Sequence, residues 1–230
     1  MVRALALLLS LCAPLGAQAQ ECRLALLLAL DVSASVDEAE DALQRKGLAA
    51  ALLAPEVQEA FFAAPPVALA AYEWSGRLKY KTLLDWTMID DRGALLAAAN
   101  RIAASTRSET EFPTAMGYAL GHGATLLQAG PACLFKTLDM SGDGVNNEGF
   151  PPAAAYAEFP FNGVTVNGLV INGADFEGEI SLIDYYREEV IRGPGAFLEV
   201  AQGFADFERA MTRKLLREVS PRTVGALSPG

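Results

Sequence analysis

The sequence predicts an α/β fold with a doubly wound, mostly parallel central sheet, one antiparallel edge strand and helices on both faces. Residues 24–30 form a continuous apolar run, which is typical of a central parallel strand buried on both faces. Beyond this run, strand patterns alternate with helix patterns, as they do in α/β proteins. Residues 66–74 and 78–86 form two strand patterns on either side of Ser75-Gly76, which predicts a hairpin and therefore an antiparallel edge.

The first strand is followed by a predicted helix over residues 36–53. Ser35 and Glu38 have the S-x-x-E spacing of a capping box, which marks the start of a helix. Pro55 ends or kinks this helix, because proline lacks the N–H group that a helix interior requires. The predicted hairpin comes next in the chain.

The alternation continues through the second half of the chain. Its patterns predict helices over residues 91–104, 114–128 and 204–219, a short helix near Ala153, and strands over 134–140, 164–171 and 196–200. An insertion occupies residues 175–195 and includes Tyr185-Tyr186 among charged residues. It is interpreted either as an amphipathic helix that closes the core or as an interaction surface.

Residues 1–20 have the features of a secretory signal peptide. Arg3 precedes the apolar stretch of residues 4–15, and Ala17 and Ala19 form the A-x-A pattern of a cleavage site. A membrane anchor is the alternative, but twelve apolar residues are too few, since a spanning helix needs about 20. The predicted organisation is a signal peptide over 1–20, a single domain over 21–220 with the insertion at 175–195, and a flexible tail over 221–230.

The charge balance indicates which partners the protein lacks, and the cysteines indicate a possible disulfide. The chain has 28 acidic and 18 basic residues, and it has no cluster of basic residues, so a nucleic-acid partner is not expected. No stable membrane insertion is expected either. Cys22 and Cys133 each precede an apolar strand pattern, and in an oxidising compartment they form either a disulfide or two buried thiols.

The strongest chemical signal is an Asp-x-Ser-x-Ser motif at the end of the first predicted strand. Asp31, Ser33 and Ser35 occupy alternate positions, so their oxygen atoms can converge on one hard cation. Mg²⁺, Mn²⁺ and Ca²⁺ prefer such oxygen ligands. A nitrogen or sulfur site is nearly excluded, because the chain has one histidine, His122, and three cysteines.

Two further oxygen donors are expected at the same edge of the sheet. Asp143 follows the predicted strand at 134–140, and Thr114 opens a predicted helix. Ligands of open α/β sheets bind at the carboxyl ends of the strands, where these loops meet. Asp31, Ser33, Ser35, Thr114 and Asp143 are therefore the candidate metal ligands.

These residues resemble the motif of von Willebrand factor A-type domains with a metal-ion-dependent adhesion site. That family has Asp-x-Ser-x-Ser after its first strand, a threonine in a second loop and an Asp-Gly pair after its fourth strand, and Asp143-Gly144 matches the pair. More narrowly, the chain resembles a bacterial secreted subgroup of unknown function, through Ser141-Gly142-Asp143-Gly144 with Asn146-Asn147, Trp74-Ser75, Trp86-Thr87, Gly193 to Phe197 and Lys214 to Glu218. The resemblance covers residues 24–219.

The resemblance implies binding rather than catalysis. In such sites the serines and the threonine contact the cation, the aspartates act mainly through water, and a carboxylate of a protein or peptide partner completes the coordination. It also implies secretion to the periplasm or the exterior of a Gram-negative bacterium. The loop before Thr114 departs from the subgroup, which often has glycines there, so Thr110 is an alternative ligand; the helix pattern after Thr114 favours Thr114.

Two other functions fit parts of the sequence. Residues 140–147 look like the Gly-Asp-Gly-x-Asn-Asp motif of haloacid dehalogenase-type phosphatases, with Asp31 as the nucleophile. That chemistry needs a second acid where this chain has Ser33, and a metal carboxylate where it has Asn147. The third interpretation is a von Willebrand-like scaffold with a vestigial or structural metal site, which binds its partner through another face such as the insertion.

Overall fold

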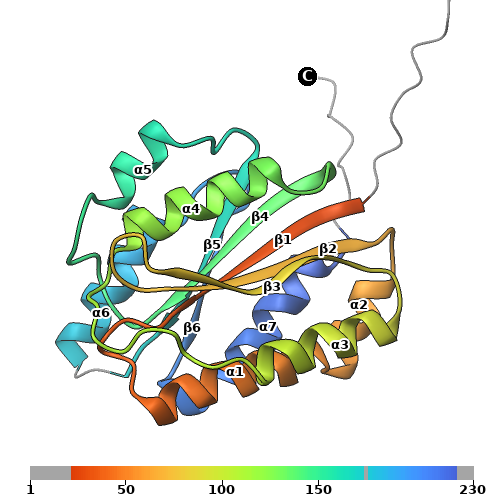
Figure 1. Ribbon diagram of the computed structural model, residues 1–230, viewed down its shortest axis with the longest axis horizontal. Coiled ribbons are helices and arrows are strands. Elements are labelled where there is room, and N and C mark those ends of the chain that lie inside the picture. The colour runs from red at the N-terminus through yellow and green to blue at the C-terminus, as the bar shows by residue number, and fades with distance from the viewer. Residues whose placement is uncertain (1–21, 174–175, 222–230) are drawn as a thin grey trace, which may run out of the picture.

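The computed structural model describes residues 22–173 and 176–221, which form one six-stranded sheet between two helical layers (Figure 1). The strands are β1 (Cys22–Asp31), β2 (Val67–Trp74), β3 (Tyr80–Ile89), β4 (Cys133–Gly142), β5 (Val164–Ile171) and β6 (Leu198–Ala201). The helices are α1 (Glu38–Leu52), α2 (Pro55–Phe62), α3 (Arg92–Ala103), α4 (Met116–Ala129), α5 (Pro152–Glu158), α6 (Phe176–Tyr185) and α7 (Phe207–Val219), with a π-helical turn η1 (Tyr186–Val190) and a 3-10 turn η2 (Phe204–Asp206). The predicted signal peptide (1–20) and the predicted tail beyond residue 221 lie outside the described residues.

The strand order is β3-β2-β1-β4-β5-β6, and β2 and β3 are the one antiparallel pair of neighbours in this sheet. The predicted fold class is therefore confirmed, including the antiparallel edge strand. At the centre, β1 and β4 are adjacent, with Leu30 opposite Ser141. The chain winds outward from these two strands in opposite directions, so their carboxyl ends flank the crevice where open α/β sheets bind ligands.

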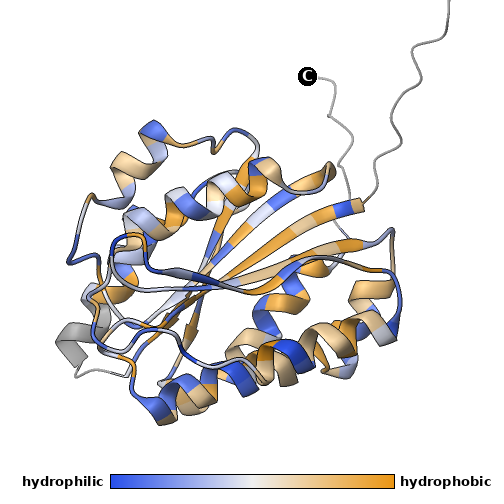
Figure 2. Ribbon diagram, viewed as in Figure 1, coloured by the Kyte–Doolittle hydropathy of each residue, from blue (hydrophilic) through white to orange (hydrophobic). Residues whose placement is uncertain are grey.

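Helices cover both faces of the sheet. α1, α2, α3 and α7 pack together on one face, whereas α4, α5, α6 and η1 lie on the other (Figure 1). The central strands are the most apolar part of the molecule (Figure 2). In β1, Leu26 and Leu28 belong to the core of the α1 face and Ala25 and Leu27 to that of the α4 face, which explains the continuous apolar run. Among the described residues, no helix is both long and apolar enough to cross a bilayer.

The first helix begins at a different cap from the predicted one. Asp37 is the N-cap: its carboxylate accepts the N–H of Glu40 at 2.8 Å, and the Glu40 carboxylate accepts the N–H of Asp37 at 2.8 Å. The predicted box of Ser35 and Glu38 is therefore wrong by two residues. Two overlapping sequences satisfy the same spacing, and the cap that forms leaves the Ser35 hydroxyl available for other partners.

Several predicted boundaries also shift. Pro55 ends the first helix and also begins a second, α2, as its first residue, a position that proline favours. The hairpin turn is wider than Ser75-Gly76, because the N–H of Ser75 bonds to the carbonyl of Lys79 and Leu78 takes a positive φ of 57°. The last helix begins after the 3-10 turn, at Phe207.

The predicted insertion is helical over residues 176–190, and residues 191–195 after it are irregular. The helical part comprises α6 and η1 and packs against the α4 face, with Leu182, Tyr186 and Val190 buried. The interpretation as an amphipathic helix that closes the core therefore agrees with the buried side of this segment. It also brings Tyr186 toward the sheet, where its hydroxyl reaches the carboxyl edge of β4.

Cys22 and Cys133 are joined by a disulfide, so of the two alternatives the structure contains the bond rather than the thiols. The two residues are opposite each other in the register of β1 and β4, with their Cα atoms 4.6 Å apart. The bond therefore ties together the starts of the two strands whose other ends carry Asp31 and Asp143.

Candidate metal centre

The sequence-predicted site residues meet at the carboxyl edge of β1 and β4. Asp31 is the last residue of β1, and Ser33 and Ser35 follow it in the loop to α1. Asp143 directly follows β4, and Thr114 lies in the loop two residues before α4, which begins at Met116 rather than at Thr114 as predicted. The structure thus brings all five together from three loops.

Hydrogen bonds link these five residues into one chain. The Asp31 carboxylate accepts the N–H of Ser33 at 2.8 Å, the hydroxyl of Thr114 donates to that of Ser33 at 3.2 Å, and the hydroxyls of Ser33 and Ser35 are 3.2 Å apart. The Ser35 hydroxyl donates to the Asp143 carboxylate at 2.8 Å. Four side-chain oxygens from the three loops are therefore linked at hydrogen-bond distance.

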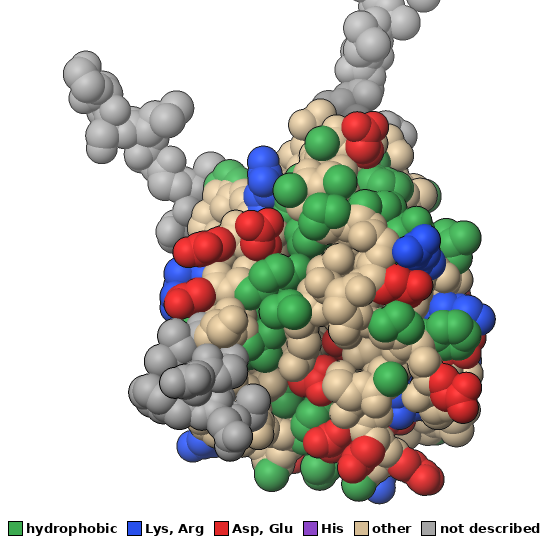
Figure 3. All heavy atoms as spheres, turned by 90° about the vertical axis from the view of Figure 1, so that its left-hand side faces the viewer, with side chains coloured by type: hydrophobic (Ala, Val, Ile, Leu, Met, Phe, Trp, Pro, Cys, Tyr) green, Lys and Arg blue, Asp and Glu red, His purple; other side chains and the backbone are tan. Residues whose placement is uncertain are grey.

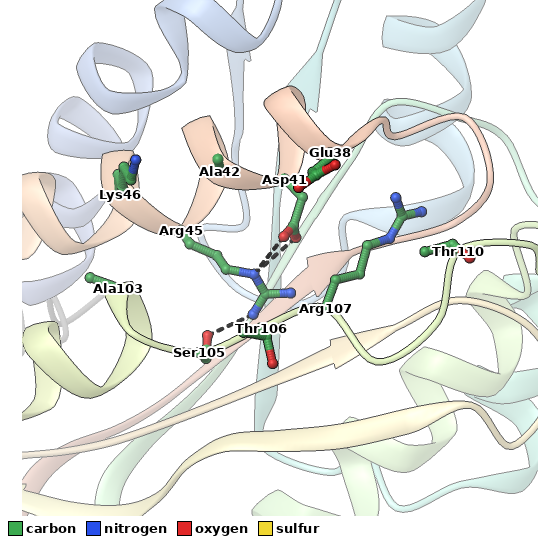
Figure 4. A pocket seen from close by; sticks show the side chains of 10 residues that line it. All are labelled: Glu38, Asp41, Ala42, Arg45, Lys46, Ala103, Ser105, Thr106, Arg107 and Thr110. Atoms are coloured by element: carbon green, nitrogen blue, oxygen red, sulfur yellow. Dashed lines mark hydrogen bonds and ion pairs between the residues drawn. The ribbon is translucent and has the colours of Figure 1, made fainter.

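Thr110, the alternative ligand, is not part of this cluster. It is exposed and lines a pocket of about 430 Å³ between α1 and the loop after α3 (Figure 4). Thr114 is buried, with 3% of its surface exposed. The floor of the pocket is Arg45, whose guanidinium donates to Asp41 and to Ser105. The structure therefore groups Thr114 with the serines and places Thr110 elsewhere.

Asn146 and Asn147 hold the threonine loop in place. The Asn147 side chain accepts the N–H of Thr114 at 2.8 Å, and its own N–H donates to the carbonyl of Thr114 at 3.0 Å. The Asn146 side chain accepts the N–H of Gly117 at 3.2 Å. The sequence identified this pair only as a match to the subgroup; the structure shows that it fixes one ligand loop to another.

Arg107 is a residue of the site that sequence reasoning missed. Its guanidinium donates to the carbonyls of Val32 and Ser33 at 2.7 Å and to that of Val36 at 2.5 Å. It thereby clamps the backbone of the Asp-x-Ser-x-Ser loop from the loop between α3 and α4. No sequence signal could reveal this role, because backbone carbonyls are common to every residue and the partners are more than 70 positions away.

Replacing Arg107 with methionine is expected to lower the free energy of unfolding by about 1–3 kcal/mol, because three partly buried carbonyls lose a charged donor. Arg107→Lys is expected to lose nearly as much, since an ammonium group cannot reproduce the fork of the guanidinium. Urea denaturation in EDTA measures both. Arg209→Met, which removes an exposed pair with Asp206, is the control and should change stability by less than about 1 kcal/mol. Equal losses in all three variants would contradict the clamp.

The two carboxyl groups of the site lie in a low-dielectric environment. Burial raises the pKa of Asp31 to about 7, with a further contribution from the negative charge of Asp143. Burial also raises the pKa of Asp143, and its hydrogen bond from Ser35 opposes this shift. Both shifts indicate a place where negative charge lacks compensation, although Arg107 offsets part of it.

The donor set fits a hard divalent cation. Three neutral hydroxyls and two carboxylates converge, and Oδ2 of Asp31 is buried without a protein hydrogen-bond partner. A buried carboxylate oxygen normally has a partner, so this atom has an unused capacity to accept. Among the described residues, no group of three or more His, Cys, Asp or Glu side chains could hold a metal ion.

Solved structures with the same fold come from several proteins. Proximal thread matrix protein 1 of the mussel byssus matches with a TM-score of 0.61 at 18% identity, covering 86% of this chain and 49% of that one. Another structure of that protein, described as having a zinc-occupied MIDAS motif, matches with a TM-score of 0.58 at 16% identity, covering 86% and 48%. A von Willebrand factor type A structure from Catenulispora acidiphila matches with a TM-score of 0.55 at 15% identity, covering 86% and 42%.

These similarities establish a von Willebrand factor A-like fold. The chain spans about half the length of each of these three structures. No curated protein matches it in sequence. One family model, described as "Protein of unknown function (DUF1194)", matches residues 21–223, so the chain belongs to that family.

Proposed function

We propose that this protein is a secreted, non-enzymatic binding module that holds a divalent cation and captures an acidic group of a protein or peptide partner. The cation site comprises Asp31, Ser33, Ser35, Thr114 and Asp143. The observation that carries the proposal is the convergence of these side chains from three loops, together with the unpartnered Oδ2 atom of Asp31. Secretion follows from the signal-peptide features of residues 1–20.

The chemistry of the donors explains why such a site binds an external acid. Ser33, Ser35 and Thr114 are neutral, so direct coordination by their hydroxyls leaves the cation electrophilic. Ser35 is exposed, which opens this side of the site to solvent and to a partner. Mg²⁺ is the preferred ion, because it takes octahedral oxygen coordination and retains waters, with Mn²⁺ and Ca²⁺ as alternatives.

The surface around the site supports both the binding of a cation and the capture of a partner's acidic group. Figure 3 faces the carboxyl edge of the sheet, and acidic side chains are frequent in its lower half. Such a field attracts a cation. Beside Asp143, a hollow of about 390 Å³ opens between α1 and the ends of β5 and β6, lined by Glu40, Ile171 and Phe204. Its volume lies within the range of small-ligand sites, so a side chain of a partner fits next to the cation.

The phosphatase interpretation receives no support from the geometry. Asn147, at the position of the expected metal carboxylate, accepts the N–H of Thr114 with its side chain. Ser33 stands where the second acid is required.

The insertion is also a weaker candidate for the binding surface. Tyr186 is fully buried, and the Tyr185 hydroxyl accepts the N–H of Asn146. The aromatic pair that distinguished this segment in the sequence therefore faces the protein rather than a partner. This arrangement favours the metal edge over the insertion as the place of recognition.

Excess Mg²⁺ is expected to raise the melting temperature of the protein by roughly 5–11 °C relative to EDTA. A ligand at 100 times its dissociation constant adds about 2.7 kcal/mol to a native-only site, and 1 kcal/mol corresponds to roughly 2–4 °C for this chain length. Asp31→Ala should abolish the rise. Thermal melts with Mg²⁺, Mn²⁺, Ca²⁺ and Zn²⁺ test the proposal and identify the ion.

The matched control is Asp85→Ala, which removes an exposed carboxylate on β3. It should keep the full Mg²⁺ effect. An unchanged melting temperature in the wild type with all four ions would refute the metal site. A partner complex with no acidic group near the cation would refute the proposed capture of an acidic group, and it would leave the metal site standing.

A further inference from the structure

Tyr186 combines complete burial with an unused hydroxyl. It is the first residue of the π-helical turn η1, its side chain lies in the core of the α4 face, and none of its surface is exposed. Its Oη atom has no hydrogen-bond partner among the described residues. Burial of a hydroxyl without a partner is unfavourable, and phenylalanine would fill the same space without that cost.

Three other tyrosines of the same core, one buried and two partly buried, do not share this property. The Tyr72 hydroxyl donates to the carbonyl of Ala119 at 2.8 Å, and that of Tyr156 donates to the carbonyl of Val190. Tyr185, next to Tyr186, accepts the N–H of Asn146 at 3.2 Å. The unpartnered hydroxyl is therefore a particular feature of Tyr186 and not of tyrosine in this core.

The hydroxyl points at the metal edge of the sheet. A Cβ atom built on Gly142 would stand 2.6 Å from Oη of Tyr186 and 2.7 Å from Oδ2 of Asp31. Thus the two unpartnered oxygens of Tyr186 and Asp31 both approach Gly142, the residue directly before Asp143. Because glycine has no side chain, it leaves the space between them open.

The chemistry of the two atoms is complementary. A carboxylate oxygen can only accept, whereas a phenol hydroxyl both donates and accepts. A water between them can bond to both atoms and still direct its oxygen toward a cation. Residues that orient ligands in this way are regular parts of metal sites, and π-helical turns such as η1 are frequent at functional sites.

We propose that Tyr186 is a positioning residue of the metal centre, whose hydroxyl and Asp31 Oδ2 together hold a water ligand of the cation on its buried side. This inference rests on the proposed cation site and assigns the segment of α6 and η1 to it. Tyr185 supports the same assignment, since it fixes the loop after Asp143 through Asn146. The segment of α6 and η1 thus contributes to the site from its buried side.

The test is Mg²⁺ titration calorimetry on Tyr186→Phe, together with its melting temperature in EDTA. The expected result is a loss of Mg²⁺ affinity of about 10–100-fold, the usual effect of removing an outer-sphere group. The melting temperature in EDTA should stay the same or rise, because the variant removes an unpartnered hydroxyl. Mg²⁺ should also perturb the tyrosine absorbance of the wild type more than that of the variant.

Tyr72→Phe is the matched control. It removes the hydroxyl that donates to the carbonyl of Ala119 and should therefore lower the melting temperature in EDTA while leaving Mg²⁺ affinity unchanged. Gly142→Ala is a second variant that fills the space between the two oxygens and should weaken Mg²⁺ binding at least as much as Tyr186→Phe. Wild-type affinity in Tyr186→Phe would overturn this inference alone, whereas a wild type that binds no Mg²⁺ would overturn the cation site and this inference with it.

Discussion

Replacing Cys22 and Cys133 with alanine is expected to lower the free energy of unfolding by about 4–5 kcal/mol. The two cysteines are 111 positions apart, and a disulfide that closes a loop of about 100 residues contributes about 4.7 kcal/mol by restricting the unfolded chain. At roughly 2–4 °C per kcal/mol, the melting temperature should fall by roughly 9–19 °C. Urea denaturation of the double variant in EDTA measures the effect.

Alanine is the appropriate replacement because both positions are buried, with 2% and 7% of their surfaces exposed. The wild type in a strong reductant is the independent comparison, since it breaks the same bond without changing the side-chain volume. Both should lose stability by a similar amount. A loss below about 1 kcal/mol in either case would mean that the bond does not limit the unfolded chain, and the prediction would be wrong.

The elements that the sequence predicts well are those whose signals are local and repeated. The continuous apolar run of β1 requires burial on both faces, and the structure provides it. The meeting of the five candidate residues could be predicted because parallel strands end at one edge, so that motifs far apart in sequence converge there. Their proximity therefore followed from topology, once the fold class was known.

The start of α1 shows where local reasoning fails. Ser35 with Glu38 and Asp37 with Glu40 have the same capping spacing, so spacing alone could not choose between them. The choice depends on a contact that is 108 residues distant, because the Ser35 hydroxyl bonds to Asp143. A serine that precedes a helix but bonds to a distant residue will be assigned wrongly by any rule that considers only neighbours.

Arg107 and Tyr186 could not be assigned for a different reason. The partners of Arg107 are backbone carbonyls, which carry no residue-specific signal. The position of Tyr186 depends on how the segment of α6 and η1 packs on the sheet, and its role depends on the missing side chain of Gly142. Neither residue is among the candidate ligands: Arg107 contacts the backbone of their loop, and the role of Tyr186 is inferred from its place behind Asp31, so no ligand motif includes them.

Replacing Lys214 with methionine is expected to destabilise the protein by about 3–5 kcal/mol at pH 8, the usual effect of removing one partner of a buried ion pair. The Lys214 ammonium is fully buried between Asp139 of β4, at 2.8 Å, and Glu218 of α7, at 2.6 Å. Methionine retains the volume but leaves two buried carboxyl groups without a cation. Lys46→Met on the exposed side of α1 is the control, and it should change stability by less than about 0.5 kcal/mol.

The pH dependence separates this charge effect from a packing defect. In the folded protein the pKa of Asp139 is raised to about 7, because burial raises it strongly, Lys214 opposes the shift and Glu218 adds to it. A raised folded pKa contributes stability that is complete below the unfolded pKa of about 3.9 and is lost as the pH rises through 7. Without Lys214 the pKa of Asp139 should rise further, so the destabilisation should be greatest at pH 8 and should shrink toward pH 5, where Asp139 is protonated. Urea denaturation of the wild type and the variant at several pH values measures how the loss of unfolding free energy depends on pH. An equal loss at pH 5 and pH 8 would contradict the charge effect and assign the loss to the packing of methionine.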